Sequence, residues 1–258
     1  MRKLVILAMA VAGLGFSNFA NAADMPTKAP VMAIQYNWTG FYVGGNVGYG
    51  WGGTTGNDLT VNDPAALFIG YAALGGFQYP SVSPKGVLGG GQIGYNFQTG
   101  SVVWGGIADF QFSDMTQSNT VAVPGLGGFF PENQSHSAKI EWFGTVRGRI
   151  GYAFNNFLPY ISGGLAYGKV SSTLNLFVPF SGAALAGQSG TTRAGWTLGA
   201  GFDYALTNNW SVGIDYLYLD LGHDTVTATN VLGLVGDSIS MNQHFTANVL
   251  RAVVNYKF

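Results

Sequence analysis

Side-chain polarity alternates along the end of the chain, and the same pattern recurs in seven earlier segments. In the last segment, TANVLRAVVNYKF (246–258), apolar or aromatic residues occupy every second position from Leu250 to Phe258, and Arg251 and Asn255 lie between them. Successive side chains of a β-strand point to opposite faces, so this segment has one apolar and one polar face. A soluble sheet covers its apolar face with another layer, whereas a β-barrel in a membrane turns that face to lipid.

Eight segments carry this alternation. They cover residues 38–51, 86–97, 102–112, 139–152, 159–170, 193–204, 209–219 and 246–258. In segment 139–152, Ile140 and Trp142 are expected on the apolar face and Glu141 on the polar face. Segment 159–170 is rich in glycine, and its pattern favours Ile161 and Leu165, together with Tyr167, on the apolar face. Repeated period-two alternation over about ten residues is typical of transmembrane barrels.

The links between these segments alternate in length. Short links span residues 98–101, 153–158 and 205–208, and long links span residues 52–85, 113–138, 171–192 and 220–245. All six tryptophans lie near predicted strand ends, where amphipathic rings favour a lipid–water interface. The sequence therefore predicts an all-β fold, an eight-stranded antiparallel transmembrane barrel with short periplasmic turns and four long extracellular loops.

The N-terminus predicts export. Arg2 and Lys3 precede an apolar run at 4–15, and Ala20-Asn21-Ala22 fits the small-x-small pattern that signal peptidase cleaves. We therefore expect a signal peptide at 1–22 with cleavage after Ala22, a periplasmic lead at 23–37 and a barrel domain at 38–258. Export followed by a membrane barrel indicates the outer membrane of a Gram-negative bacterium.

Composition agrees with a lipid-facing surface. Only 9% of residues are charged, against roughly 25% in typical globular domains, while 47% are hydrophobic. The formal net charge is −1, so nothing indicates nucleic-acid binding. The absence of cysteine excludes disulfides and thiolate metal sites. We expect neither a metal nor a cofactor.

Eight charged residues are expected to point into the barrel. They are Asp109, Glu141, Asp203 and Asp215, with Arg147, Arg149, Arg193 and Arg251. The interior of an eight-stranded barrel is just wide enough for side chains to fill it, and unpaired buried charge costs several kcal/mol. An ion-paired network that fills the lumen is one interpretation, and a polar path for small solutes is the other.

Two motifs resemble enzyme or nucleotide sites. Gly89–Gly94 fits the G-x-G-x-x-G pattern, but a dinucleotide site needs a helix after its glycines, and here Tyr95 continues a strand. Asp220, His223 and Asp224 group where a predicted strand enters a long loop, and a histidine oriented by an acid can act as a base. No serine partner is evident, so we expect no enzymatic activity.

His136, His223 and His244 all fall in predicted extracellular loops. Imidazole binds haem iron, so these residues are candidate haem ligands, and exposed polar loop residues are the alternative interpretation. The loop segments 65–79 and 174–186 are apolar, which favours either adhesion to other surfaces or packing over the barrel mouth.

Several strings resemble the small outer-membrane barrels of alphaproteobacteria, the 25–31 kDa relatives of the opacity-type and OmpA-like barrels. They are YNWTGFYVGGNVGYGW (36–51), WFGTVRGRIGYAF (142–154), LPYISGGLAYGKV (158–170), GWTLGAGFDYALTNNWSVGIDYLYLDLG (195–222) and NVLRAVVNYKF (248–258). The resemblance implies insertion by the barrel assembly machinery, which reads a terminal aromatic strand such as Tyr256–Phe258. Family members often carry an inward acid two residues before Asp109, where this chain has Ile107.

The resemblance implies a structural role in the cell envelope together with surface interaction. The partners it implies are outer-membrane lipid and lipopolysaccharide, the assembly machinery, and host or surface molecules. The alternative is transport, by a small-solute porin or by a haemin-binding surface receptor.

Overall fold

The computed structural model describes residues 36–62, 82–123, 132–178, 183–230 and 238–258. The predicted signal peptide, most of the predicted lead and the apolar segment 65–79 lie outside these ranges. Within them, no helix is long and apolar enough to cross a membrane.

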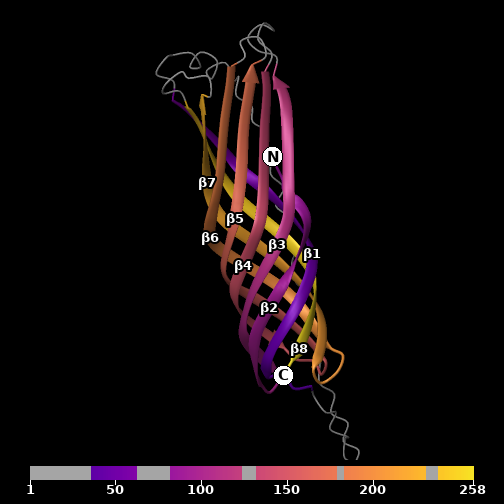
Figure 1. The fold of residues 1–258 in the computed structure, drawn as a ribbon. Coiled ribbons are helices and arrows are strands. Elements are labelled where there is room, and N and C mark those ends of the chain that lie inside the picture. The colour runs from indigo at the N-terminus through magenta and orange to yellow at the C-terminus, as the bar shows by residue number, and fades with distance from the viewer. Residues whose placement is uncertain (1–35, 63–81, 124–131, 179–182, 231–237) are drawn as a thin grey trace, which may run out of the picture. The chain divides into compact units, whose positions relative to one another are not determined.

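Eight antiparallel strands close into a barrel in sequence order, with β1 pairing to β8 (Figure 1). The strands are β1 (Gly40–Asn62), β2 (Lys85–Thr99), β3 (Val102–Val123), β4 (Glu132–Tyr152), β5 (Phe157–Val178), β6 (Ala183–Ala205), β7 (Trp210–Asn230) and β8 (Ser238–Lys257). The predicted fold is confirmed. Short turns connect β2 to β3, β4 to β5 and β6 to β7, as expected.

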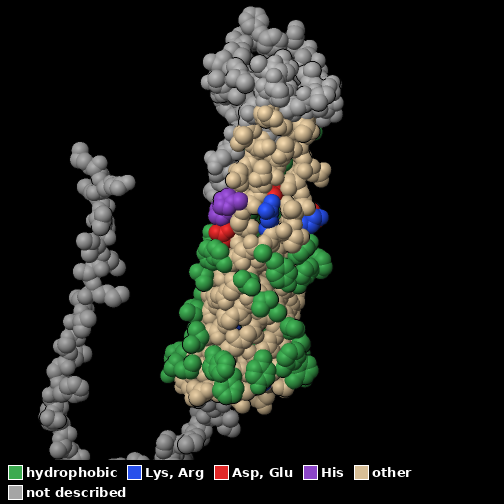
Figure 2. Space-filling model, turned by 90° about the vertical axis from the view of Figure 1, so that its left-hand side faces the viewer, with side chains coloured by type: hydrophobic (Ala, Val, Ile, Leu, Met, Phe, Trp, Pro, Cys, Tyr) green, Lys and Arg blue, Asp and Glu red, His purple; other side chains and the backbone are tan. Residues whose placement is uncertain are grey.

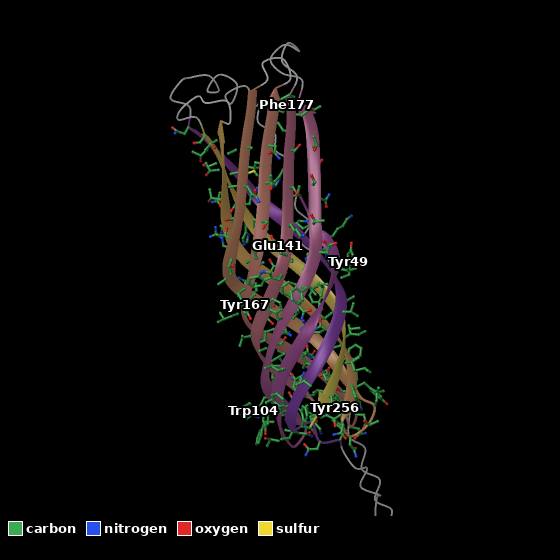
Figure 3. The ribbon with its side chains drawn as sticks, in the orientation of Figure 1. Tyr49, Trp104, Glu141, Tyr167, Phe177 and Tyr256 are labelled. Carbon is green, nitrogen blue, oxygen red and sulfur yellow. The ribbon has the colours of Figure 1, made fainter. Side chains whose placement is uncertain are left out.

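Apolar side chains cover the outside of the lower barrel. Ile161 and Leu165 on β5 are 64% and 67% exposed, so the facing predicted for this glycine-rich segment is confirmed. Figure 3 shows aromatic side chains at two levels, with Trp104 and Tyr256 near the short turns and Tyr167 further up the wall. The two aromatic levels and the apolar surface between them form the apolar belt that a lipid bilayer requires.

The strands continue well past this belt, so much of each predicted long loop is strand. β3 runs to Val123 and β7 to Asn230, about eleven residues beyond the predicted ends in both cases. Above the belt the outer face carries residues such as Thr116, Ser118 and Thr120, which are exposed. Without lipid to face, the outer side chains no longer need to be apolar, and the alternation that marks a membrane strand fades.

Strand register shifts interrupt the ladder on β1, β3, β4, β6 and β7, all on the side away from the short turns. On β4 the shift lies between Ile140 and Trp142 and makes Glu141 an extra residue. An extra residue reverses the facing of the side chains on one side of it relative to the other, and here the reversed side is the one away from the short turns. Ile140 is therefore buried inside the barrel and Glu141 lies on the outer wall, and the predicted facing of both residues was wrong.

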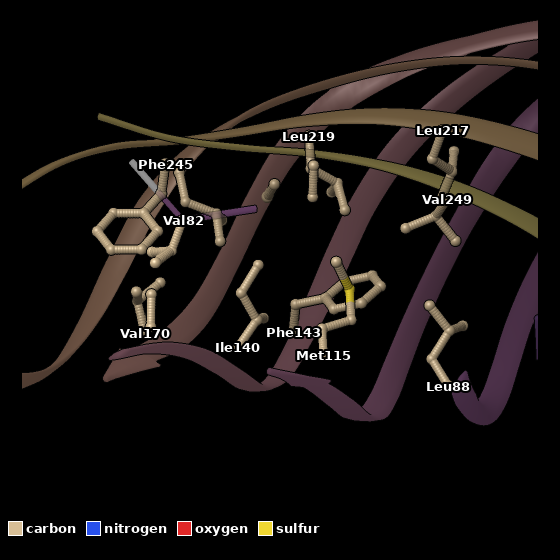
Figure 4. Close-up of a cluster of buried hydrophobic side chains, with 14 residues drawn as sticks. Val82, Leu88, Met115, Ile140, Phe143, Val170, Leu217, Leu219, Phe245 and Val249 are labelled. Atoms are coloured by element: carbon tan, nitrogen blue, oxygen red, sulfur yellow. The ribbon is translucent and has the colours of Figure 1, made fainter. Parts of the chain in front are cut away.

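The barrel interior is layered, and β4 passes through every layer. From the short-turn end its inward side chains are Arg149, Arg147, Thr145, Phe143, Ile140, Ala138, His136 and Gln134. Charged side chains thus lie nearest the short turns, and an apolar cluster follows. Figure 4 shows this upper apolar cluster, in which Phe143 and Ile140 pack with Met115, Leu219 and Phe245.

Candidate functional site in the barrel interior

The chain closes the short-turn end of the barrel with the residues that precede β1. Trp38 is buried, and its backbone N donates to Gln98 Oε1 at 2.8 Å. The Tyr36 hydroxyl donates to the carbonyl of Asn208 at 3.1 Å, and Lys257 Nζ lies 4.4 Å from the Tyr36 ring centroid. Burial, followed by the charge of an acidic side chain inside the barrel, raises the pKa of Tyr36, which keeps the phenol protonated as a donor. Tyr36 belongs to the predicted lead, yet it packs against the barrel.

The first charged layer centres on Arg149. Its Nη1 lies 2.9 Å from Asp203 Oδ2, and its Nε donates to Asn96 Oδ1 at 2.8 Å. The guanidinium also lies between two aromatic rings, 5.0 Å from the Tyr42 centroid and 4.9 Å from the Tyr160 centroid. Ion pairing, hydrogen bonding and cation–π contact together compensate the loss of water around this buried cation.

Four side chains form the central cluster: Arg147, Arg251, Asp109 and Asp215. Asp109 Oδ2 lies 3.0 Å from Arg147 Nη2 and 3.1 Å from Arg251 Nη2. Asp215 Oδ2 lies 3.2 Å and 2.9 Å from the same two atoms. These side chains are at most 2% exposed. Two cations therefore share two anions, and the cluster is neutral as a whole.

Hydroxyl groups add further hydrogen bonds to the central cluster. Thr145 Oγ1 donates to Asp109 Oδ2 at 2.7 Å and accepts a bond from Arg147 Nε at 3.0 Å. Arg147 Nη1 donates to Ser162 Oγ at 2.8 Å. Because Arg147 sits on β4, Asp109 on β3 and Ser162 on β5, these bonds join three neighbouring strands from the inside.

Neutral amides add to this interior on the side of β2 and β8. Gln92 Nε2 donates to Asn255 Oδ1 at 2.8 Å, and both side chains are buried. The alternation in the sequence places these amides inward. Nothing in the pattern identifies which amide pairs with which charge, because that depends on how the strands close.

One of the eight predicted lumen charges, Glu141, lies on the outer wall, whereas Arg193 faces inward as predicted, because β6 pairs it with Gly168 and β5 pairs Gly168 with the inward Phe143. Glu141 Oε2 lies 2.9 Å from Lys169 Nζ on the outer wall, and Ser171 donates to Glu141 at 2.7 Å. Arg193 pairs with Asp224 above the central cluster. Asp224 was not predicted to face inward, because the register shift on β7 reverses its face. Gly222, whose φ is +74°, is the one local signal of this shift.

The outer Glu141–Lys169 pair is expected to contribute little stability. Both side chains are about a third exposed, at 33% and 38%, and water screens such a pair. Glu141→Gln should lower the free energy of unfolding by less than about 1 kcal/mol, measured by urea titration of the refolded barrel. A loss above about 2 kcal/mol would show that Glu141 stabilises the barrel as strongly as a buried ion pair does.

The three histidines lie on strands, not in loops as predicted. His136 is fully buried inside the barrel, 2.9 Å from Gln243 Nε2. His223 and His244 stack on the outer wall with ring centroids 4.5 Å apart, and His244 Nε2 lies 2.8 Å from Asp220 Oδ1. The wall thus separates His136 from the other two. In the described ranges, no three His, Cys, Asp or Glu side chains are arranged to hold a metal ion.

The two motifs that resemble enzyme or nucleotide sites are both parts of barrel strands. The β7 shift puts Asp220 and His223 outside and Asp224 inside, so this group does not share one face. Gly89–Gly94 lies within β2, whose strand continues to Thr99. A Cβ on Gly90 would lie 2.0 Å from the carbonyl oxygen of Phe110, so close strand packing accounts for this glycine.

The apolar segment 174–186 is largely strand. Leu174 on β5 is fully buried inside the barrel, whereas Phe177 is 46% exposed on the outside. Alternation along an extended strand accounts for these opposite environments, and this part of the segment is not a loop.

Comparison with known proteins places the chain in a family. The model of the outer membrane protein beta-barrel domain matches residues 7–258. The 31 kDa outer-membrane immunogenic protein of Brucella melitensis is 39% identical over 99% of this chain and 100% of its own length. The 22 kDa outer membrane protein of Rhizobium leguminosarum is 36% identical over 51% of this chain and 52% of its own length. Among solved structures, the outer membrane protein OprG from Pseudomonas aeruginosa has a TM-score of 0.47 and 14% identity, covering 87% of this chain and 99% of that one. The chain therefore belongs to the outer-membrane protein β-barrel domain family and is a protein of the outer membrane.

Proposed function

We propose that this outer-membrane protein acts as a closed barrel that strengthens the envelope and presents its extended upper strands to other surface molecules, without catalysing a reaction. The neutral central cluster carries this proposal. Two arginines and two aspartates from four strands meet across the lumen within 3.2 Å, and an open pore needs that same space for solute.

The layers on either side support a closed lumen. Leu219, Phe245 and Met115 fill the level above the charges, and each is at most 2% exposed. Trp38 and Tyr36 cover the short-turn mouth. A solute would have to displace an apolar layer, a charged layer and an aromatic cover in turn.

Assembly by the barrel machinery is part of the same proposal. Phe258 donates its backbone N–H to the carbonyl of Phe41 at 3.0 Å, and its ring lies 5.2 Å from that of Tyr256. The terminal aromatic strand therefore closes the barrel against β1, which is the step that an assembly factor would need to control.

Single-channel recording tests the closed barrel. We expect the purified protein in a planar lipid bilayer to give at most small, irregular currents, because the pairs of the central cluster hold each other in place. An open general porin recorded in the same bilayers is the positive control. Large, stable, ohmic current steps would overturn the closed barrel and favour the small-solute porin.

A further inference from the structure

Strands β6 and β7 lose their backbone pairing to each other in the upper barrel. No residue of 187–195 on β6 is paired with β7, and no residue of 221–228 on β7 is paired with β6, although the structure describes both ranges. β6 stays paired to β5 throughout, and β7 stays paired to β8 above its register shift. We call these two ranges the seam. The pair Trp196–Asp220 closes it below, at the level where charged and histidine side chains follow the apolar ones (Figure 2).

Water reaches the inner face of β6 at the seam. Thr191 lies two residues before the inward Arg193 and is opposite Val170 on β5, so both Thr191 and Val170 face the lumen. Val170 is completely buried, whereas Thr191 is exposed. The Arg193 side chain is 35% exposed, while that of Asp224 across the seam is 1% exposed. A continuous wall would bury both residues of such a pair, so the seam is an interruption of the wall that ends at Asp224.

Side chains bridge the seam where the backbone does not. Thr191 Oγ1 donates to Asp224 Oδ1 at 3.0 Å, and Arg193 Nη2 donates to the same oxygen. Both donors belong to β6 and the acceptor belongs to β7, so one carboxylate joins the two strands. We call these two contacts the latch. Two side-chain contacts open at a lower free energy than a backbone ladder of the same length, because fewer bonds have to break together.

Buried polar atoms lie behind the latch without a hydrogen-bond partner among the described residues. They are Asp224 Oδ2, Arg193 Nε and the Oε1 of Gln243, which is opposite Asp224 on β8. Most buried polar atoms in proteins are paired, so these three indicate contact with water or with another small polar molecule. The Arg193–Asp224 pair is neutral as a whole. Two acceptors and one donor beside it suit an uncharged, hydroxyl-bearing molecule better than an ion.

We propose that the seam is a side entrance to the upper lumen, which the latch holds closed and which admits small, uncharged, hydrophilic molecules from the medium around the upper barrel. The entrance ends above the upper apolar cluster, whose members Leu221 and Phe245 are at most 2% exposed. It therefore gives access to the polar atoms behind the latch without crossing the barrel. The side entrance stands or falls separately from the closed lower lumen.

Thiol labelling of the refolded full chain tests the side entrance. The chain has no cysteine, so Val226→Cys places a single thiol on the inner face of β7, where the native side chain is completely buried. Hydroxyethyl methanethiosulfonate, which is small, uncharged and water-soluble, is the probe, and mass spectrometry follows the modified fraction with time. We expect Asp224→Ala to increase the rate of modification about tenfold, because it removes the acceptor of both latch contacts.

Arg193→Met opens the latch from the other strand and should also increase the rate of modification. Removing the Asp224 carboxylate favours the reactive thiolate, whereas removing the Arg193 cation disfavours it. A faster reaction in both variants therefore reports opening of the seam and not a change in thiol reactivity. An increase confined to Asp224→Ala, or no increase in either variant, would overturn the side entrance.

Two controls show whether the opening is local. Asp220→Ala removes an acid of the same strand that contacts His244 on the outer wall and does not bridge the seam, so it should leave the rate unchanged. Ile140→Cys moves the thiol into the upper apolar cluster, where the native side chain is 2% exposed, and should stay unmodified in every background. An Asp220→Ala rate equal to that of Asp224→Ala would overturn the latch. Modification of Ile140→Cys as fast as that of Val226→Cys in Asp224→Ala would show that the whole barrel has loosened, which would overturn the side entrance.

Discussion

Arg147→Met is expected to lower the free energy of unfolding by about 3–5 kcal/mol, because it leaves two buried carboxylates with one cation. Asp109 and Asp215 would then share Arg251 alone, at the 0–2% exposure that excludes water. Urea or guanidinium titration of the refolded barrel, followed by tryptophan fluorescence, measures the loss.

A double-mutant cycle separates charge from packing in this cluster. Asp109→Leu combined with Arg147→Met removes both partners of one pair, so its loss should fall short of the sum of the single losses by more than about 1 kcal/mol. Lys169→Met is the matched control, since it removes a cation from a pair that is about a third exposed. Equal losses for Arg147→Met and Lys169→Met would contradict the assignment of stability to the interior.

Leu165→Arg is expected to lower the free energy of unfolding in lipid vesicles by about 2–4 kcal/mol, because it places a charge within the apolar belt. Leu165 is 67% exposed on β5, so the substitution leaves the barrel interior unchanged. The cost should shrink strongly in a denaturant titration of the barrel in short-chain detergent, where water reaches the wall.

The control for this substitution lies above the belt. Thr192 on β6 is opposite Lys169 and is exposed, so Thr192→Arg should cost less than about 1 kcal/mol in the same vesicles. If both arginines cost the same, the apolar belt does not end below the level of Thr192 and Lys169.

Much of the lower barrel follows from alternation alone. On each strand, every second residue is polar, and Arg147, Asp109 and Asp215 occupy such positions. Their inward facing could therefore be predicted without any contact information. The alternation failed at Glu141 and Ile140, because one inserted residue on β4 reverses the facing of the residues between it and the end of the strand away from the short turns. A period-two pattern contains no mark of an insertion unless a residue such as Gly222 accompanies it.

The upper strands and the histidines show a second kind of failure. The outer face of the upper strands carries Ser, Thr and Asn, which are also typical of loops. Hydrogen bonding between two strands cannot be recognised from the polarity of either strand alone. His136 was therefore predicted in a loop, although its strand carries it inside to contact Gln243. Likewise, Tyr36 shows no pattern that predicts its packing under the barrel mouth.

The polarity pattern of the amino-acid sequence was sufficient to predict an outer-membrane barrel of eight strands and the lipid-facing side chains of its lower part. Each strand has one face towards lipid and one towards the lumen, so the residue types along a single strand are enough to tell its two faces apart. The pairing of the interior charges, the positions of the register shifts and the inward place of His136 became known only from the folded barrel. Contacts between different strands depend on the register in which the barrel closes, and the polarity pattern of one strand does not contain that register.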